Sequence, residues 1–203
     1  MRPMVQSRSE ETRSKVIEAA RALLMRKGVA DVSLADIREE SGVSNGSIFH
    51  HFGSKDGVVA QVFVAERRTY LAEVARAVVE FDGDPCDALG EGARMALVYQ
   101  MRDPQRFSRL VLDFTDSEWM RENRQIWLDL AADLTAPVAE WAAPHFAEGR
   151  LPRLPPAFIQ SMMMGGTERL VSSYLMGRLE EDPMKLADAV AVFISGGLRS
   201  MIR

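Results

Sequence analysis

Apolar residues recur at intervals of three and four along most of the chain, which is the spacing of helices with one buried face. In the segment from Glu11 to Lys27 this pattern runs through Val16, Ala20 and Leu24. Gly28 follows the last turn, where glycine commonly ends a helix. Because the same spacing continues beyond this segment, we expect an all-α protein.

Two short helices are predicted next, each preceded by a serine that can cap it. Ser33 caps a helix that runs to about Ser41, where Gly42 breaks it. Ser44 caps a third helix, which contains the apolar Ile48. Two short helices separated by a turn that begins with glycine form a helix-turn-helix unit. In such a unit the last helix enters the major groove of DNA by its N-terminal end.

A fourth, longer helix is predicted to begin near Lys55, after a capping Ser54, and to run through Val78. Further breaks follow at Asp82–Pro85 and at Asp103–Pro104. We therefore expect a helix-turn-helix domain over residues 10–70, which the long helix joins to a second helical domain over residues 71–203.

The segments Pro156–Leu179 and Pro183–Ile202 are apolar or small on almost every face. A helix that is apolar all round must be covered all round, and the chain has too few other helices to cover both. We expect the two segments to pack against their copies in a second subunit, as a four-helix interface about a two-fold axis. The expected interface residues are Phe158, Met162, Gly166, Tyr174, Val190, Phe193, Ile194 and Gly197.

Composition indicates a globular protein in a reducing compartment. Hydrophobic residues make up 47% and charged residues 27% of the 203 residues, and Cys86 has no second cysteine to pair with. The N-terminus has no signal-peptide core, and the apolar stretch from Leu186 to Ile202 contains Asp188 and Arg199. We expect no membrane partner and a cytoplasmic, nucleoid-associated location.

The net charge of −4 is unevenly distributed. Residues 1–57 hold nine basic and eight acidic side chains, so the acidic excess lies in the rest of the chain. This asymmetry is mild, and it permits a DNA-facing N-terminal end without proving one.

Three interpretations fit the adjacent His50 and His51: a metal site, solvated surface groups or a DNA-facing surface. Consecutive helical residues point about 100° apart, so the pair cannot chelate one ion. His145, the only other histidine, lies on a distant predicted helix. We expect no metal or other cofactor, and the DNA-facing interpretation is favoured.

The run from Ser33 to Asp56 resembles the TetR family of bacterial transcriptional regulators. It contains SLADI followed by GVSNGSIFHHFGSKD, which is similar to the family pattern T-x-x-D-I-A-x-x-A-G-V-S-x-G-x-[LI]-Y-x-[YH]-F-x-[SN]-K-[ED]. Three positions depart from it: Glu39-Glu40-Ser41 replaces small residues, Asn45 stands where lysine or proline is frequent, and Phe49 replaces a tyrosine. The phenol expected at position 49 would reach a phosphate, and a benzyl group cannot.

The resemblance implies a homodimer that binds a pseudo-palindromic DNA operator, usually as a repressor, and that a small-molecule effector releases. The positions that match DNA-contacting positions of the family are Ser33, Ser44, Asn45, Gly46, Ser47, Phe49, His50, His51 and Lys55.

Met163 is a candidate effector contact because methionine adapts to varied shapes, although a core or interface role explains it at least as well. The other candidates follow from family position alone, and each is equally compatible with a core or surface role. They are Tyr70, Arg94, Tyr99, Phe107, Asp113, Phe114, Trp127 and Glu168.

Two other classes of function stay open at this point. One is an enzyme on a helical scaffold, although the chain contains no HExxH motif, phosphate-binding glycine loop or nucleophile elbow. The other is an adaptor whose apolar C-terminal helices hold a different protein. Neither alternative explains the caps, the turn glycine and the polar face of the third helix together.

Overall fold

The computed structural model describes residues 8–113, 118–122 and 124–202. Every regular element in these residues is a helix, which confirms the all-α prediction. The chain forms two compact units. The first comprises Met1–Arg67 with Ser108–Asn123, and the second comprises Arg68–Phe107 with Arg124–Arg203. The division expected from the sequence placed residues 108–123 in the second domain, whereas they group with the first unit.

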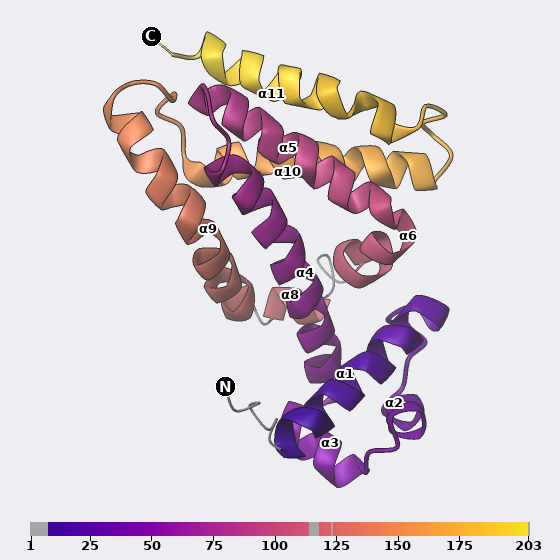
Figure 1. The fold of residues 1–203 in the computed structure, drawn as a ribbon. Helices are drawn as coiled ribbons and strands as arrows, with labels where there is room; N and C mark the ends of the chain where they lie inside the picture. The colour runs from indigo at the N-terminus through magenta and orange to yellow at the C-terminus, as the bar shows by residue number, and fades with distance from the viewer. Residues whose placement is uncertain (1–7, 114–117, 123, 203) are drawn as a thin grey trace, which may run out of the picture. The chain divides into compact units, whose positions relative to one another are not determined.

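The first unit contains the predicted helix-turn-helix (Figure 1). Its described elements are α1 (Arg8–Lys27), α2 (Leu34–Ser41), α3 (Asn45–Phe52), the first part of α4 (Lys55–Val79), the π-helix η1 (Ser108–Leu112) and α8 (Glu118–Glu122). One buried apolar side chain from each of α2 and α3, Ile37 and Ile48, is fully covered. Buried residues of α1 and α4, among them Val16, Leu24 and Val58, add to this core.

Side-chain caps fix where α2 and α3 begin. The Ser33 hydroxyl accepts a hydrogen bond from the Asp36 amide at 3.2 Å, and the Asp36 carboxylate accepts one from the Ser33 amide at 2.9 Å. The Ser44 hydroxyl accepts from the Ser47 amide at 3.3 Å. Gly42 ends α2 with a φ of 66°, a conformation that glycine adopts at little cost. The turn between the two helices is therefore set by local chemistry.

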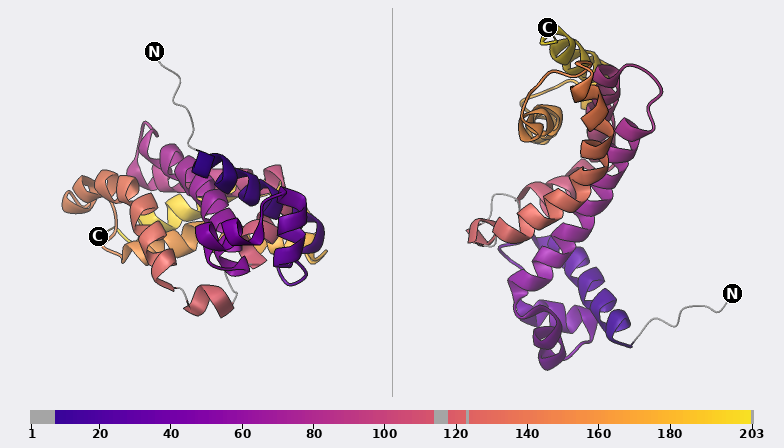
Figure 2. Two further views of the ribbon diagram at one scale, coloured as in Figure 1. Left: turned by 90° about the horizontal axis from the view of Figure 1, so that it is seen from below. Right: turned by 90° about the vertical axis from the view of Figure 1, so that its left-hand side faces the viewer.

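The second unit is built around α5 (Pro85–Arg102), which contacts both α10 (Pro156–Leu175) and α11 (Ala187–Ser200), as Figure 1 shows. The short helix α6 (Pro104–Phe107) follows α5, and η2 (Pro183–Leu186) stands between α10 and α11. Figure 2 shows α9 (Arg124–Ala147) beside the C-terminal part of α4. No helix among the described residues is long and apolar enough to cross a membrane.

A buried polar network ties three helices of the second unit together. The Gln100 amide nitrogen on α5 donates hydrogen bonds to the Tyr70 hydroxyl at 2.8 Å and to the Thr167 hydroxyl at 2.9 Å. The Tyr70 ring also packs against the rings of Tyr99 and Phe107, at centroid distances of 5.2 and 5.1 Å. These contacts fix α4, α5 and α10 relative to one another, because a buried polar group must keep its partners.

Two glycines near the ends of α3 and α4 give a test of this packing. A Cβ atom added at Gly57 would collide with the carbonyl oxygen of Phe52, whereas one added at Gly46 would meet nothing within 4 Å. We expect Gly57→Ala to lower the free energy of unfolding by about 1–3 kcal/mol because the backbone must move. Gly46→Ala should leave stability unchanged or raise it by up to about 1 kcal/mol. Chemical denaturation followed by circular dichroism measures both, and equal stability of the two variants would contradict the packing.

Candidate nucleic-acid interface and ligand cavity

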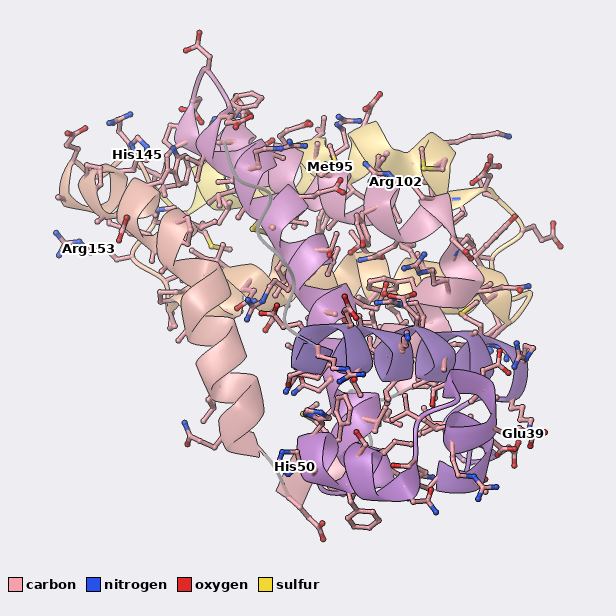
Figure 3. All side chains as sticks on the ribbon, turned by 60° about the horizontal axis from the view of Figure 1, so that its bottom comes forward. Glu39, His50, Met95, Arg102, His145 and Arg153 are labelled. Atoms are coloured by element: carbon pink, nitrogen blue, oxygen red, sulfur yellow. The ribbon has the colours of Figure 1, made fainter. Side chains whose placement is uncertain are left out.

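One side of α3 faces away from the core of the first unit. Ile48 is fully buried, whereas Asn45, Gly46, Phe49 and His50 are exposed. Figure 3 shows the labelled His50 on the outer side of this helix. The helix thus presents two polar side chains, a phenyl ring and a glycine to the solvent.

The N-terminal turn of α3 adds backbone donors to this face. Ser44 caps the amide of Ser47, and the carbonyl of Ser44 accepts from the amide of Ile48. The first amides of a helix carry partial positive charge and suit phosphate oxygens. The amides of Asn45 and Gly46 occupy this first turn.

The rings of His50 and His51 lie edge to face on α3. Their ring centroids are 5.2 Å apart with an interplanar angle of 64°, and His51 also packs edge-on against Phe52. Within the described ranges, no three His, Cys, Asp or Glu side chains are grouped so that they could hold a metal ion.

Two of the predicted contact residues outside α3 have partners within the first unit. The Lys55 ammonium, at the start of α4, lies 3.5 Å from the Val29 carbonyl oxygen. The Ser33 hydroxyl also donates to the Asp36 carboxylate at 2.7 Å. Hydrogen bonds from Lys27 and Ser33 hold the pKa of the Asp36 carboxyl well below its usual range, so this cap stays ionised at neutral pH.

The first unit is braced at two points on α1. The Arg21 guanidinium donates to Glu66 on α4 at 2.8 Å, where the carboxylate is largely buried. Arg109, on η1, donates to the carbonyl oxygen of Met25 at 2.5 Å. These contacts attach α4 and η1 to α1.

The second unit contains an apolar cavity of about 450 Å³. Its walls come from α4, α5, α9 and α10 and from the loop before α10. The lining residues are Leu71, Val74, Ala75, Val78, Leu89, Thr135, Val138, Ala139, Ala142, Ala143, Phe146, Leu151, Pro156, Ala157, Ile159, Gln160, Met163 and Met164. Among the lining residues whose side chains are described, Thr135 and Gln160 are the only polar ones. The cavity thus suits a mostly hydrocarbon molecule.

Of the predicted effector contacts whose side chains the structure describes, Met163 alone lines the cavity. Tyr70, Tyr99 and Phe107 instead form the ring cluster that packs with Gln100. Arg94 makes a two-pronged ion pair with Glu91, one turn earlier on α5, with both distances at 2.7 Å.

The remaining predicted contacts lie elsewhere. Asp113 belongs to the first unit, and burial raises the pKa of its carboxyl while the charge of Arg109 opposes that rise. Glu168 is half-buried on α10 and is not part of the cavity lining. Phe114 and the side chain of Trp127 lie outside the residues whose placement is described.

Sequence reasoning missed most of the cavity wall, above all the residues of α9. Val138, Ala139, Ala142 and Phe146 look like ordinary core positions in the sequence, since small and apolar residues at helical spacing are typical of any buried helix. Only the placement of four helices shows that they surround a space.

The residues expected at a subunit interface lie on α10 and α11 and are exposed or half-buried. Phe193 is 79% exposed, Phe158 and Met162 are about half exposed, and Gly166 and Gly197 are exposed. Tyr174, Val190 and Ile194 are half-buried. Val192, which was not predicted, is 70% exposed beside them.

The helix-turn-helix unit and the cavity-containing helical unit together define a two-domain helix-turn-helix protein. Residues 16–62 match the family model described as "Bacterial regulatory proteins, tetR family". The chain is 35% identical over 107 residues to the HTH-type transcriptional regulator TtgR of Pseudomonas putida, a match that covers 52% of this chain and 45% of that protein. The helix-turn-helix segment of the chain is thus of the TetR type.

Solved structures share the whole fold. A TetR family transcription regulator from Marinobacter aquaeolei VT8 superposes with a TM-score of 0.69 at 16% identity, covering 96% of this chain and 98% of that one. The transcriptional regulator FadR from Bacillus subtilis, solved in complex with stearoyl-CoA, gives 0.66 at 16% identity and covers 90% and 98%. The aligned segment spans about half the length of TtgR, whereas both structures match along nearly their full length.

Proposed function

We propose that the protein is a transcriptional regulator that binds an operator in double-stranded DNA through α3 and leaves it when an apolar small molecule enters the cavity. The observation that carries the proposal is a short, capped helix with an exposed polar face at the end of a helix-turn-helix. The enzyme hypothesis is not retained, because the named relatives are transcription regulators.

Each polar group on the proposed interface has a role that suits its chemistry. Asn45, at the first position of α3, can pair with the N6 and N7 edge of adenine. Ser33, Ser44, Ser47, His50, His51 and Lys55 supply hydroxyl, imidazole and ammonium groups for phosphate contacts, and such contacts position a protein on the duplex.

Selection from a pool of randomised duplexes tests DNA binding, with affinities then measured by fluorescence anisotropy. We expect a pseudo-palindromic sequence to be enriched and its affinity to fall steeply as salt rises. Lys55→Ala should weaken all sequences alike and reduce the salt slope by about one for each phosphate that the lysine neutralises. Asn45→Ala should remove about 1–3 kcal/mol of discrimination in binding free energy at one base pair of each half-site.

Lys185→Ala serves as the matched control, since this lysine is 72% exposed in its side chain and lies on η2 in the second unit. It should bind like the wild type. No enrichment of any sequence at low salt would contradict the proposed function.

We also propose that the active species is a homodimer joined through α10 and α11. Support comes from the exposure of the large apolar side chains Phe158, Met162, Val192 and Phe193 on these two helices, since exposed apolar patches mark interaction sites. A two-fold pair would bring each patch against its own copy and place two α3 helices on one operator.

Phe193→Glu tests the dimer, because this exposed side chain can be changed without disturbing the core. We expect sedimentation or light scattering to give a dimer mass for the wild type and a monomer mass for Phe193→Glu at micromolar concentration. Phe49→Glu makes the same change at an exposed phenylalanine of the first unit and should remain dimeric. A wild-type monomer, or a Phe193→Glu dimer of unchanged stability, would contradict the interface.

The proposed effector is an uncharged, mostly hydrocarbon molecule with at most one or two polar atoms. Support comes from the lining residues that the structure describes, among which Thr135 and Gln160 are the only polar side chains and none is ionisable. Burying a charge there without a partner would be costly. The stearoyl chain in the FadR complex is a ligand portion of this kind.

We propose that α4 transmits the effect of effector binding to the DNA-binding helix α3. Helix α4 begins at Lys55, beside the end of α3, and its last turns contribute Leu71, Val74, Ala75 and Val78 to the cavity. An effector that binds one orientation of these turns more tightly increases the fraction of molecules in which α4 has that orientation. If DNA binds the other orientation better, the effector lowers the affinity for DNA.

N-phenyl-1-naphthylamine, a neutral apolar fluorophore, tests the cavity. We expect its fluorescence to rise saturably with one site for each chain and to show at least about tenfold weaker binding in Ala142→Phe, because the added ring fills the space. Ala136→Phe is the control, since Ala136 is exposed on the same helix and does not line the cavity. Equal binding by both variants would place the fluorophore elsewhere.

A further inference from the structure

Phe49 is an apolar side chain on a polar surface. Its side chain is 56% exposed, and its neighbours Asn45, Gly46 and His50 are exposed with it. Leaving a phenyl ring in water forgoes the free energy that burial would release. On the face proposed to contact DNA, an apolar group of the DNA that covers the ring would therefore stabilise the complex.

Gly46 is unexplained by the protein itself. An added Cβ would meet nothing within 4 Å, and the backbone φ does not lie in the left-handed region that favours glycine. Glycine also lowers helix stability relative to alanine. Neither packing nor backbone geometry requires it, so close approach by an outside molecule is the remaining physical reason.

Asn45, Gly46 and Phe49 share one side of α3. Asn45 and Phe49 are four residues apart and Gly46 and Phe49 are three apart, which are the spacings of neighbours on a helix surface. Helical side chains lean toward the N-terminus, so the ring leans toward the turn that carries Asn45. No atom lies within 4 Å of a Cβ added at Gly46, so the surface beside the ring is open to a base edge.

In the major groove, thymine presents a methyl group and adenine presents the N6 and N7 pair that asparagine can read. We propose that Phe49 is a specificity-determining residue that packs on the 5-methyl group of a thymine next to the adenine contacted by Asn45. This inference rests on the proposed DNA-binding function. It assigns α3 a preference for A·T pairs at neighbouring positions of each half-site.

The replacement of hydroxyl by hydrogen at this position changes what the ring can contact. A phenol would donate to a phosphate oxygen, which carries no sequence information. A phenyl ring has no such donor, and apolar contact with a thymine methyl is the base contact open to it. The departure from tyrosine thus moves one contact from the backbone of the duplex to a base.

The test replaces each thymine of the selected operator, one position at a time in both half-sites, with deoxyuridine. Uracil pairs like thymine and lacks only the methyl group. Removing one buried methyl from each half-site should raise Kd by about fourfold per methyl, or about fifteenfold for a symmetric pair. We expect this weakening at one thymine position in the wild type and its disappearance in Phe49→Ala, which binds both operators weakly and equally.

Two further variants separate this role from a general weakening of binding. Lys55→Ala, a proposed phosphate contact, should weaken the thymine and uracil operators by the same factor and so keep the wild-type discrimination. Gly46→Ala should retain its fold and bind the operator more weakly, because its Cβ would occupy the open surface beside the ring.

Three outcomes overturn the proposal. One is equal binding of thymine and uracil operators by the wild type at every position. Another is discrimination that persists unchanged in Phe49→Ala, since the methyl would then be read by another group. If the wild type enriches no DNA sequence at all, the proposed function fails, and that result is distinct from the first two, in which DNA is bound.

Discussion

The continuity of α4 is the constraint on which the proposed coupling depends. A single helix from Lys55 to Val79 supplies Val58 and Val62 to the buried core of the first unit and four apolar side chains to the cavity of the second. At its start, Gly57 lies against the backbone end of α3, and farther along Tyr70 hydrogen-bonds with Gln100. Because a helix is stiff over this length, a displacement at one end of α4 can move its other end.

The helix-turn-helix could be predicted from the sequence because its signals are local. Ser33 and Ser44 cap amides within three residues, Gly42 ends α2 in the left-handed region, and Ile48 points inward on its short helix. Each feature depends on side-chain chemistry and short spacing, which the sequence displays directly. The exposure of Phe193 also followed from pattern, since its helix carries apolar residues on more faces than one neighbour can cover.

The cavity could not be predicted in the same way. Its wall combines residues of α4, α5, α9 and α10, and a Leu or Ala that lines a space is indistinguishable in sequence from one that fills a core. Aromatic and charged residues are chemically distinctive in the sequence, which makes them candidates for effector contacts. Tyr70 and Phe107 are used in packing, and the partner of Arg94 is Glu91 on the same helix, at a spacing of three that the sequence already contains.

Coupling between cavity and operator is the central claim, and reciprocity gives its most direct test. The affinity of N-phenyl-1-naphthylamine is measured by titration calorimetry on the free protein and on the protein saturated with its selected operator. Since a ligand that weakens DNA binding must itself bind more weakly to the DNA complex, we expect Kd to rise by about 5- to 150-fold with operator present. An equal Kd in the two states would show that the cavity and the DNA-binding face are uncoupled.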